Sequence, residues 1–131
     1  MSTHVLVTGA AGYLGSVLSE HLLDAGFRVT AVDNLMYGQQ GPFHLCANDR
    51  FDFIFGDVRD ERLIGPLVKK ADVLIPLAAL VGATACDRDP HMAQAVNLEA
   101  PLLINRIRSK HQLLIFPNTN SGYGTNSGES F

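Results

Sequence analysis

Tryptophan is absent from this chain of 131 residues, and cysteine is rare, with only Cys46 and Cys86. Two thiols are too few for the disulfide framework of a small secreted domain, and they favour a reducing compartment. Charged residues make up only 18% of the chain, and the lysines and arginines are scattered. We therefore expect no nucleic-acid partner, because such a partner requires a concentrated basic patch.

Long hydrophobic runs are also missing. The longest, residues 73–85, is too short to cross a bilayer and is interrupted by Pro76 and Gly82. The first residues lead directly into an apolar run without the basic segment of a secretory signal. These absences predict a cytoplasmic protein with no membrane partner.

Short apolar runs alternate with segments of helical periodicity along the whole chain. Because 47% of the residues are hydrophobic, the chain can form a core, and its length suits one domain, residues 1–131. Continuous rather than alternating apolar runs are typical of parallel strands buried on both faces. The pattern predicts an α/β fold, a Rossmann doubly wound parallel sheet in the order 3-2-1-4-5. The expected strands are residues 4–8, 27–32, 51–55, 73–77 and 113–116, and the expected helices are residues 12–25, 60–70 and 89–109.

Several local features of these elements are also expected from the sequence. Residues 34–50 are polar and aperiodic, which predicts a long surface connection. Asp89 and Pro90 suit an N-cap and the first position of a helix. Pro101 should bend that helix, because it removes the hydrogen bond to the carbonyl of residue 97, and we hypothesise that the bend shapes the cofactor contact. The buried face of the first helix is expected to carry Leu14, Val17, Leu18, His21 and Leu22.

The stretch VLVTGAAGYLGS places Gly9, Gly12 and Gly15 at the junction of the first strand and the first helix. The first turn of a helix has unpaired N–H groups and the positive end of the helix dipole, so it attracts a diphosphate. Gly9 and Gly12 would let the phosphate approach, and Gly15 would let the helix pack closely against the strand. The alternative is a tight strand–helix turn without a ligand.

Two further features favour a dinucleotide over that alternative. Asp33 ends the second predicted strand, where a carboxylate can accept hydrogen bonds from an adenosine ribose. Its negative charge would repel a 2′-phosphate, and Asn34 beside it is not a cation, so NAD is favoured over NADP. The segment GDVRD, residues 56–60, ends the third strand within reach of the adenine.

The ordered set TGAAGYLGS, VDN, GDVRD, PLAALVG, DP…VN and PNTNSGYG resembles the N-terminal half of the extended short-chain dehydrogenases/reductases. It is most similar to the NAD-dependent nucleotide-sugar epimerases and dehydratases, the group that includes UDP-glucose 4-epimerase. The resemblance covers essentially the whole chain. It implies that this chain is truncated relative to the family and lacks its C-terminal substrate domain.

The resemblance also implies a role for each matching position. The diphosphate would be held by Gly9, Gly12, Tyr13, Leu14 and Gly15, the adenosine ribose by Asp33 and Asn34, and the adenine by Asp57 and Val58. The nicotinamide side would be lined by Leu77, Ala78 and Ala79, with Asn97 next to the cofactor. Thr119, four residues before Tyr123 and Gly124, matches the catalytic Ser/Thr of the family, whose hydroxyl binds the sugar oxygen that is oxidised.

The family uses a tyrosine base in a Tyr-x-x-x-Lys motif, and this motif is absent from the sequence. The chain is therefore a fragment of a longer enzyme or naturally short, and we expect it to bind NAD without converting a sugar. The full-length enzyme would act on a UDP-, GDP-, CDP- or dTDP-linked sugar, as an epimerase or a dehydratase, and would pair as a homodimer. The alternative is a non-catalytic NAD(H) sensor or regulatory module of the same superfamily.

The segment CDRDPH, residues 86–91, contains four potential metal ligands: Cys86, Asp87, Asp89 and His91. A loop and N-cap that lead into a helix explain the same residues. Since no second cluster of ligands supports a metal centre, we expect none.

Overall fold

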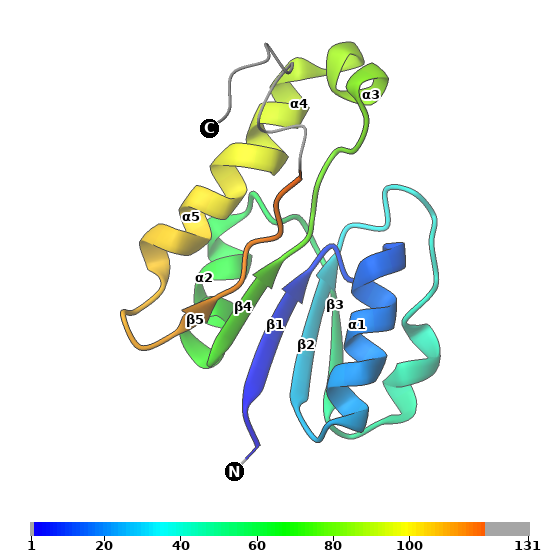
Figure 1. The fold of residues 1–131 in the computed structure, drawn as a ribbon, viewed down its shortest axis with the longest axis vertical. Helices are drawn as coiled ribbons and strands as arrows, with labels where there is room; N and C mark the ends of the chain where they lie inside the picture. Colours follow the sequence, from blue (N-terminus) through cyan, green and yellow to red (C-terminus); the bar gives the residue numbers. More distant parts are fainter. Residues whose placement is uncertain (1, 120–131) are drawn as a thin grey trace, which may run out of the picture.

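The computed structural model describes residues 2–119. Five parallel strands form one sheet in the order β3-β2-β1-β4-β5, as the sequence predicts (Figure 1). The strands are β1 (His4–Thr8), β2 (Arg28–Asp33), β3 (Phe51–Phe55), β4 (Val73–Pro76) and β5 (Leu113–Leu114). β1 lies at the centre, where it pairs with β2 on one side and β4 on the other.

The helices cover both faces of this sheet (Figure 1). On one face, α1 and η1 pack over β1, β2 and β3. On the other, α2 and α5 pack over β1, β2 and β4. No helix within residues 2–119 is long and apolar enough to cross a membrane. The helical elements are α1 (Tyr13–Asp24), the 3₁₀ turn η1 (Phe43–Ala47), α2 (Glu61–Lys70), α3 (Ala83–Arg88), α4 (Pro90–Gln94), the π turn η2 (Ala95–Glu99) and α5 (Ala100–Ile107).

The face of α1 that packs on the sheet differs from the predicted one. Gly15, Ser19 and Leu23 are buried, whereas Leu14 and Val17 are 55% and 41% exposed. The reason is steric: an added Cβ at Gly15 would overlap the carbonyl oxygen of Gly9 and lie 2.6 Å from the Cα of Ala10. Small residues therefore set the helix against the turn before it, and the larger apolar side chains are rotated outward. His21 is exposed as well, while Leu18 and Leu22 are half-buried and pack on the core.

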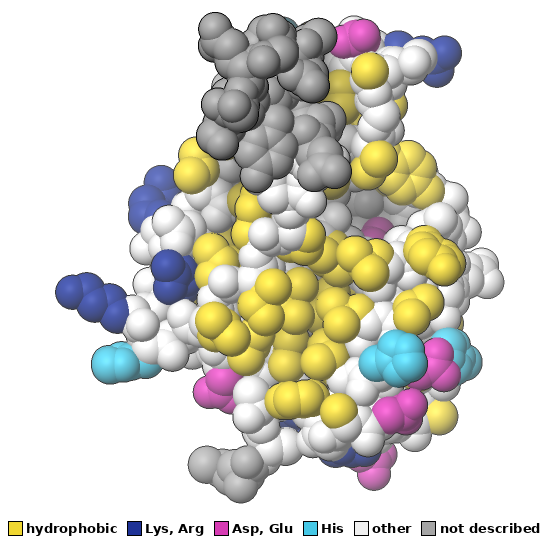
Figure 2. Space-filling view, in the orientation of Figure 1, with side chains coloured by type: hydrophobic (Ala, Val, Ile, Leu, Met, Phe, Trp, Pro, Cys, Tyr) yellow, Lys and Arg dark blue, Asp and Glu magenta, His cyan; other side chains and the backbone are white. Residues whose placement is uncertain are grey.

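The outward rotation of Leu14 and Val17 adds to an exposed apolar surface. Figure 2 shows hydrophobic side chains gathered across the face that carries α1. On β5 and just beyond it, Leu113 and Ile115 are also exposed. Leu114, between them, packs on the opposite face against the core of α2 and α5, because neighbouring residues of a strand point to opposite faces.

The structure differs in detail from several of the sequence predictions. The last strand covers only Leu113–Leu114 rather than residues 113–116. The connection over residues 34–50 contains η1, whose Leu45 is buried in the core. The segment after β4 forms the short helix α3, which the sequence analysis did not predict. The last predicted helix begins at Pro90 with Asp89 as its N-cap, as expected. It is interrupted by the π turn η2 just before Pro101, the residue that lacks the N–H for the regular ladder.

We predict that Gly15→Ala lowers the free energy of unfolding by about 1–3 kcal/mol, because the added methyl group would overlap backbone that cannot move independently. Val17→Ala is the control in the same helix, on its exposed side, and should change stability by less than about 0.5 kcal/mol. Urea denaturation followed by circular dichroism measures both. Equal stability of Gly15→Ala and the parent chain would contradict the close approach of α1.

Candidate functional site

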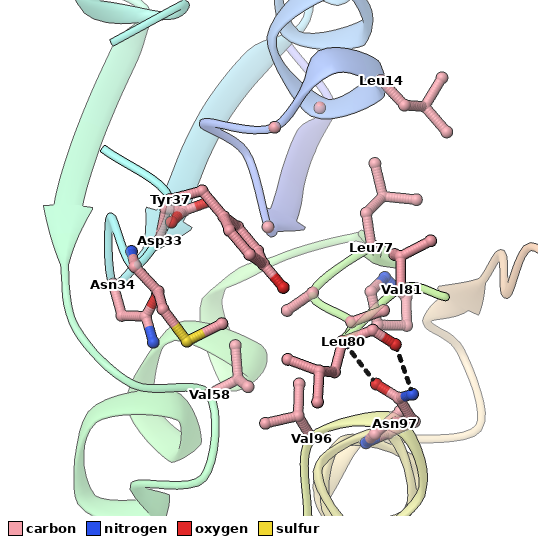
Figure 3. Close-up of a pocket in the computed structure, with 18 of the residues that line it drawn as sticks. Leu14, Asp33, Asn34, Tyr37, Val58, Leu77, Leu80, Val81, Val96 and Asn97 are labelled. Atoms are coloured by element: carbon pink, nitrogen blue, oxygen red, sulfur yellow. Dashed lines mark hydrogen bonds between the residues drawn. The ribbon is translucent and has the colours of Figure 1, made fainter. Parts of the chain in front are cut away.

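The carboxyl ends of the strands enclose a cavity of about 890 Å³. It lies at the carboxyl ends of the neighbouring strands β1 and β4, the point at which the chain crossovers reverse direction along the sheet. Open α/β sheets bind ligands at this switch point. Figure 3 shows the cavity surrounded by the glycine-rich turn, the ends of β2 and β4, and the helix that contains Asn97. All the residues expected to contact the cofactor, and Thr119, line this one cavity: Gly9, Gly12, Tyr13, Leu14, Gly15, Asp33, Asn34, Asp57, Val58, Leu77, Ala78, Ala79, Asn97 and Thr119.

The glycine-rich turn brings the amino end of α1 to the cavity wall. Gly12 is the N-cap residue and makes no side-chain capping bond, and the first N–H groups of a helix have no partners within it. The turn itself is held by the N–H of Gly12, which donates to the carbonyl of Gly9 at 3.2 Å. This wall therefore presents backbone donors and the positive end of a helix dipole, a combination that suits an anion.

Gly9 has a structural reason of its own to lack a side chain. Its φ of +68° favours glycine, and an added Cβ would lie 2.5 Å from the backbone nitrogen of Ala78. The sequence analysis attributed this glycine to phosphate approach, whereas the structure shows close contact with the loop after β4. Gly12 is more open, since the nearest atom to an added Cβ is the carbonyl oxygen of Gly9 at 3.3 Å.

Asp33, at the end of β2, holds two loops through its carboxylate. Oδ2 accepts a hydrogen bond of 2.9 Å from the N–H of Ala11, in the glycine-rich turn. Oδ1 accepts one of 2.7 Å from the N–H of Leu35, in the following loop. The side chain thus fixes the loop after β1 relative to the loop after β2. Asp33 also lines the cavity, and its carboxylate oxygens have further lone pairs that can accept hydrogen bonds from a ligand.

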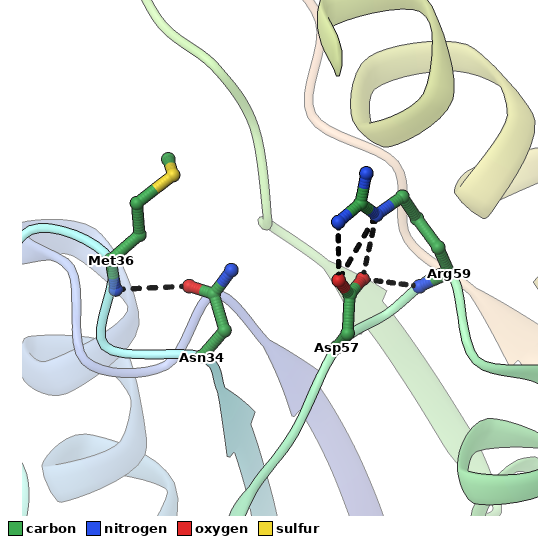
Figure 4. Close-up of polar contacts among 4 residues, drawn as sticks. All are labelled: Asn34, Met36, Asp57 and Arg59. Atoms are coloured by element: carbon green, nitrogen blue, oxygen red, sulfur yellow. Dashed lines mark hydrogen bonds and ion pairs between the residues drawn. The ribbon is translucent and has the colours of Figure 1, made fainter.

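Asp57, at the end of β3, is paired with Arg59 (Figure 4). The Nε of Arg59 donates to Oδ1 of Asp57 at 2.9 Å, its backbone N–H donates to the same oxygen at 2.8 Å, and its guanidinium also reaches Oδ2. These side-chain bonds lower the pKa of Asp57 below its ordinary value, against the opposing effect of partial burial. The charge of Arg59 is thereby neutralised at the edge of the site.

Asn97 fixes the loop after β4 from the helix opposite. Its Oδ1 accepts a hydrogen bond of 2.7 Å from the N–H of Leu80, and its Nδ2 donates to the carbonyl of Leu80 at 2.9 Å (Figure 3). The thiol of Cys86 donates to the same carbonyl. Asn97 lies within the π turn η2, and π turns inside α-helices are frequent at functional sites. Its carboxamide is therefore committed to the protein backbone, as well as lining the cavity.

Thr119 lies at the end of the described part of the chain. It lines the cavity, and its N–H donates to Oδ1 of Asn118 at 2.8 Å. Tyr123 and Gly124, which the sequence analysis used to align Thr119 with the family pattern, lie outside the described residues.

The structure adds residues that the sequence analysis did not select. The loop after β2 contributes Met36, Tyr37 and Gln39 to the cavity, and the loop after β4 contributes Leu80 and Val81. Their position in the loop directly after a strand was a usable signal, because such loops form the ligand-binding edge of a parallel sheet. Within residues 2–119 there is no group of three or more side chains suited to hold a metal ion.

We predict that Arg59→Gln raises the pKa of Asp57 toward its ordinary value. Because the native pKa is lowered, the pair stabilises the folded state above the pKa of an unfolded aspartate, and this contribution disappears as the pH falls through the lowered native pKa. Carboxyl-carbon NMR titration measures the midpoint. Arg28→Gln, which removes the separate ion pair with Asp52, is the control and should leave the midpoint of Asp57 unchanged. An unchanged midpoint in Arg59→Gln would contradict the assigned cause.

Known proteins match this chain in both sequence and structure. The sequence profile of the NAD dependent epimerase/dehydratase family matches residues 5–130. The UDP-glucose 4-epimerase of Mycolicibacterium smegmatis is 38% identical over 95 residues, which cover 71% of this chain and 30% of that protein.

Two solved structures share the fold. The PbgP3 protein from Burkholderia pseudomallei has a TM-score of 0.84 at 28% identity, and the match covers 100% of this chain and 39% of that one. The UDP-glucose 4-epimerase from Bifidobacterium longum, solved in complex with NAD⁺ and UDP, has a TM-score of 0.78 at 30% identity and covers 94% and 39% of the two chains.

The chain thus spans about a third of the length of the curated relatives it matches. The match lies over the glycine-rich turn, the sheet and the cavity. Since the family profile extends over nearly the whole sequence, the chain belongs to the NAD-dependent epimerase/dehydratase family.

Proposed function

We propose that this chain is the NAD-binding portion of a nucleotide-sugar epimerase or dehydratase. One observation carries the proposal: residues from widely separated segments, each matching a cofactor position of the family, line a single cavity at the amino end of α1. Relatives solved with NAD support the choice of cofactor.

The cavity offers a separate environment for each part of NAD. The backbone from Gly12 to Gly15 would hold the diphosphate, because unpaired N–H groups and the helix dipole favour negative charge. Asp33 and Asn34 would bind the adenosine ribose. Asp57 and Val58 would contact the adenine, and the segment from Leu77 to Ala79 would lie along the nicotinamide.

The charges around Asp33 favour NAD over NADP. A 2′-phosphate would lie against the carboxylate of Asp33, which is committed by two backbone hydrogen bonds and is therefore not free to turn away. The guanidinium of Arg59 is paired with Asp57, so it is not available as a phosphate partner without breaking that pair. The repulsion by Asp33 and the pairing of Arg59 with Asp57 both weaken the binding of a 2′-phosphate, and so both favour NAD over NADP.

Bound NAD supplies a hydride acceptor and donor, and Thr119 is the residue of this chain proposed to act on the sugar. Its hydroxyl would hydrogen-bond the sugar oxygen and hold its proton in line for a base. The Tyr-x-x-x-Lys pair that provides such a base in the family is absent from the 131 residues. We therefore assign cofactor binding to this chain and hydride transfer to the full-length enzyme.

A second candidate is a non-catalytic NAD(H)-binding module that senses the redox state of the cofactor. The two candidates differ in the chain that follows. A reading frame that continues beyond Phe131 into Tyr-x-x-x-Lys favours the enzyme, and one without this pair favours the sensor.

We predict that isothermal titration calorimetry detects NAD binding to this chain, with NADP bound at least tenfold more weakly. Asp33→Asn should weaken NAD binding and reduce the difference between the NAD and NADP affinities, because the carboxylate both binds the ribose and repels a 2′-phosphate. Asp52→Asn is the matched control: Asp52 is exposed and lies outside the cavity, so its loss should leave both affinities unchanged. Failure of the folded chain to bind NAD or NADH would refute the proposed function.

The substrate class is tested in the full-length protein. With UDP-, GDP-, CDP- and dTDP-linked sugars, an epimerase or dehydratase should form NADH transiently, seen as absorbance near the reduced-nicotinamide band. Loss of this signal in Thr119→Val, with NAD affinity retained, would support its role at the sugar oxygen. No transient with any member of the panel would exclude the nucleotide-sugar assignment.

A further inference from the structure

The loop after β4, residues 77–81, has no regular secondary structure, and all five of its residues line the cavity. It joins the end of β4 to α3 and contains the segment to which we assigned the nicotinamide. A segment outside the sheet has no ladder of hydrogen bonds, so other groups must pair with its backbone and hold it in place. Which groups hold this loop therefore decides the shape of one wall of the cavity.

The start of the loop is attached to β1. The N–H of Leu77 donates to the carbonyl of Thr8 at 3.0 Å, and the N–H of Ala78 donates to the hydroxyl oxygen of Thr8 at 3.5 Å. Neither residue next to Leu80 makes a hydrogen bond within residues 2–119. Beyond its start, the loop is therefore fixed at Leu80.

The backbone of Leu80 is bound from two helices. Figure 3 shows the two hydrogen bonds that the carboxamide of Asn97 makes with its N–H and its carbonyl. The same carbonyl accepts a third bond, from the thiol of Cys86 in α3, with Sγ 3.4 Å from the oxygen. A carbonyl oxygen has two lone pairs, so both donors can bind it at the same time. Asn97 and Cys86 thus hold one peptide group of the cavity wall together.

The thiol is also the side-chain link between α3 and this loop. None of the six residues of α3 is fully buried. Within residues 2–119, Cys86 is the only residue of α3 whose side chain makes a hydrogen bond. Cys86 is half-buried and does not line the cavity. Any effect of the thiol on a ligand in the cavity must therefore pass through Leu80.

We propose that Cys86 is a positioning residue for the nicotinamide: its thiol completes the hold on the carbonyl of Leu80 and fixes the middle of the loop after β4. This inference rests on the proposed NAD-binding function. A wall that is fixed before the ligand arrives loses less conformational entropy on binding. Since the adenine and the diphosphate are assigned to other walls, the contribution of Cys86 is confined to the nicotinamide end of the cofactor.

The test compares two ligands by isothermal titration calorimetry: NAD, and ADP-ribose, which lacks the nicotinamide. Cys86→Ala removes the donor. Because a thiol is a weak donor, we expect about threefold weaker binding of NAD, with the affinity for ADP-ribose unchanged. Cys86→Ser differs from Cys86→Ala by one hydroxyl group, which again supplies a donor, so its affinity for NAD should return to that of the parent chain.

Cys46→Ala is the matched control. Cys46 is the other free thiol of the chain, lies exposed in η1 and does not line the cavity. Its removal should leave the affinities for both ligands unchanged. Urea denaturation of each variant verifies that the folded state is retained, so that a difference in affinity is not caused by unfolding.

Equal weakening of NAD and ADP-ribose binding in Cys86→Ala would overturn the inference, because the loss would then concern the whole site. Parent-like NAD affinity in Cys86→Ala would also overturn it, as would a Cys86→Ser variant that binds NAD as weakly as Cys86→Ala. Each of these results leaves the proposed function standing. A folded parent chain that binds neither NAD nor ADP-ribose would overturn both.

Discussion

The cavity and the fold depend on one close approach of backbone to backbone, where β1 and β4 end. Gly9 lies against Ala78, and the carbonyl of Gly9 in turn lies against Gly15 in the first turn of α1. A side chain at either glycine would separate these elements. Because the contact is made without side chains, α1 begins directly beside the edge of the sheet, and its unpaired N–H groups line the cavity at the carboxyl ends of the strands. The anion site that we propose thus depends on how closely the helix can pack.

The loops around the cavity are held by side chains rather than by regular secondary structure. Asp33 joins the glycine-rich turn to the loop after β2, and Asn97 joins the helix to the loop after β4. Each side chain satisfies backbone groups that would otherwise lack partners. A site fixed in this way before the ligand arrives loses less conformational entropy on binding. The residues with the strongest resemblance to cofactor ligands are therefore also structural residues, and their substitution affects both properties.

The sequence was sufficient to predict the strand order from local patterns, and the resemblance to the family indicated many of the residues that line the cavity. Apolar runs such as residues 4–8 mark strands, and chain crossovers in parallel sheets have a fixed hand. The buried side of α1 was predicted only in part. Leu18 and Leu22 pack on the core as expected, but Leu14 and Val17 are exposed, because the close contact at Gly15 turns the small residues inward. The π turn at Asn97 was also missed. Pro101 indicated an irregularity in the helix. The sequence did not show that this irregularity is a π turn, or that Asn97 within the turn is hydrogen-bonded to Leu80.

By itself, the sequence determined the family, the parallel α/β architecture and many of the residues at the carboxyl edge of the sheet, because glycine spacing, apolar runs and ordered motifs can be recognised without knowing the fold. Only the tertiary structure decided what those residues contact: that Gly9 accommodates Ala78, that Asp57 is paired with Arg59, and that Leu80 is bound by both Asn97 and Cys86. The physical reason is that packing between segments distant in the chain selects one arrangement among the many that the local pattern allows. A contact between two such segments depends on both of them, so it cannot be predicted from either one alone.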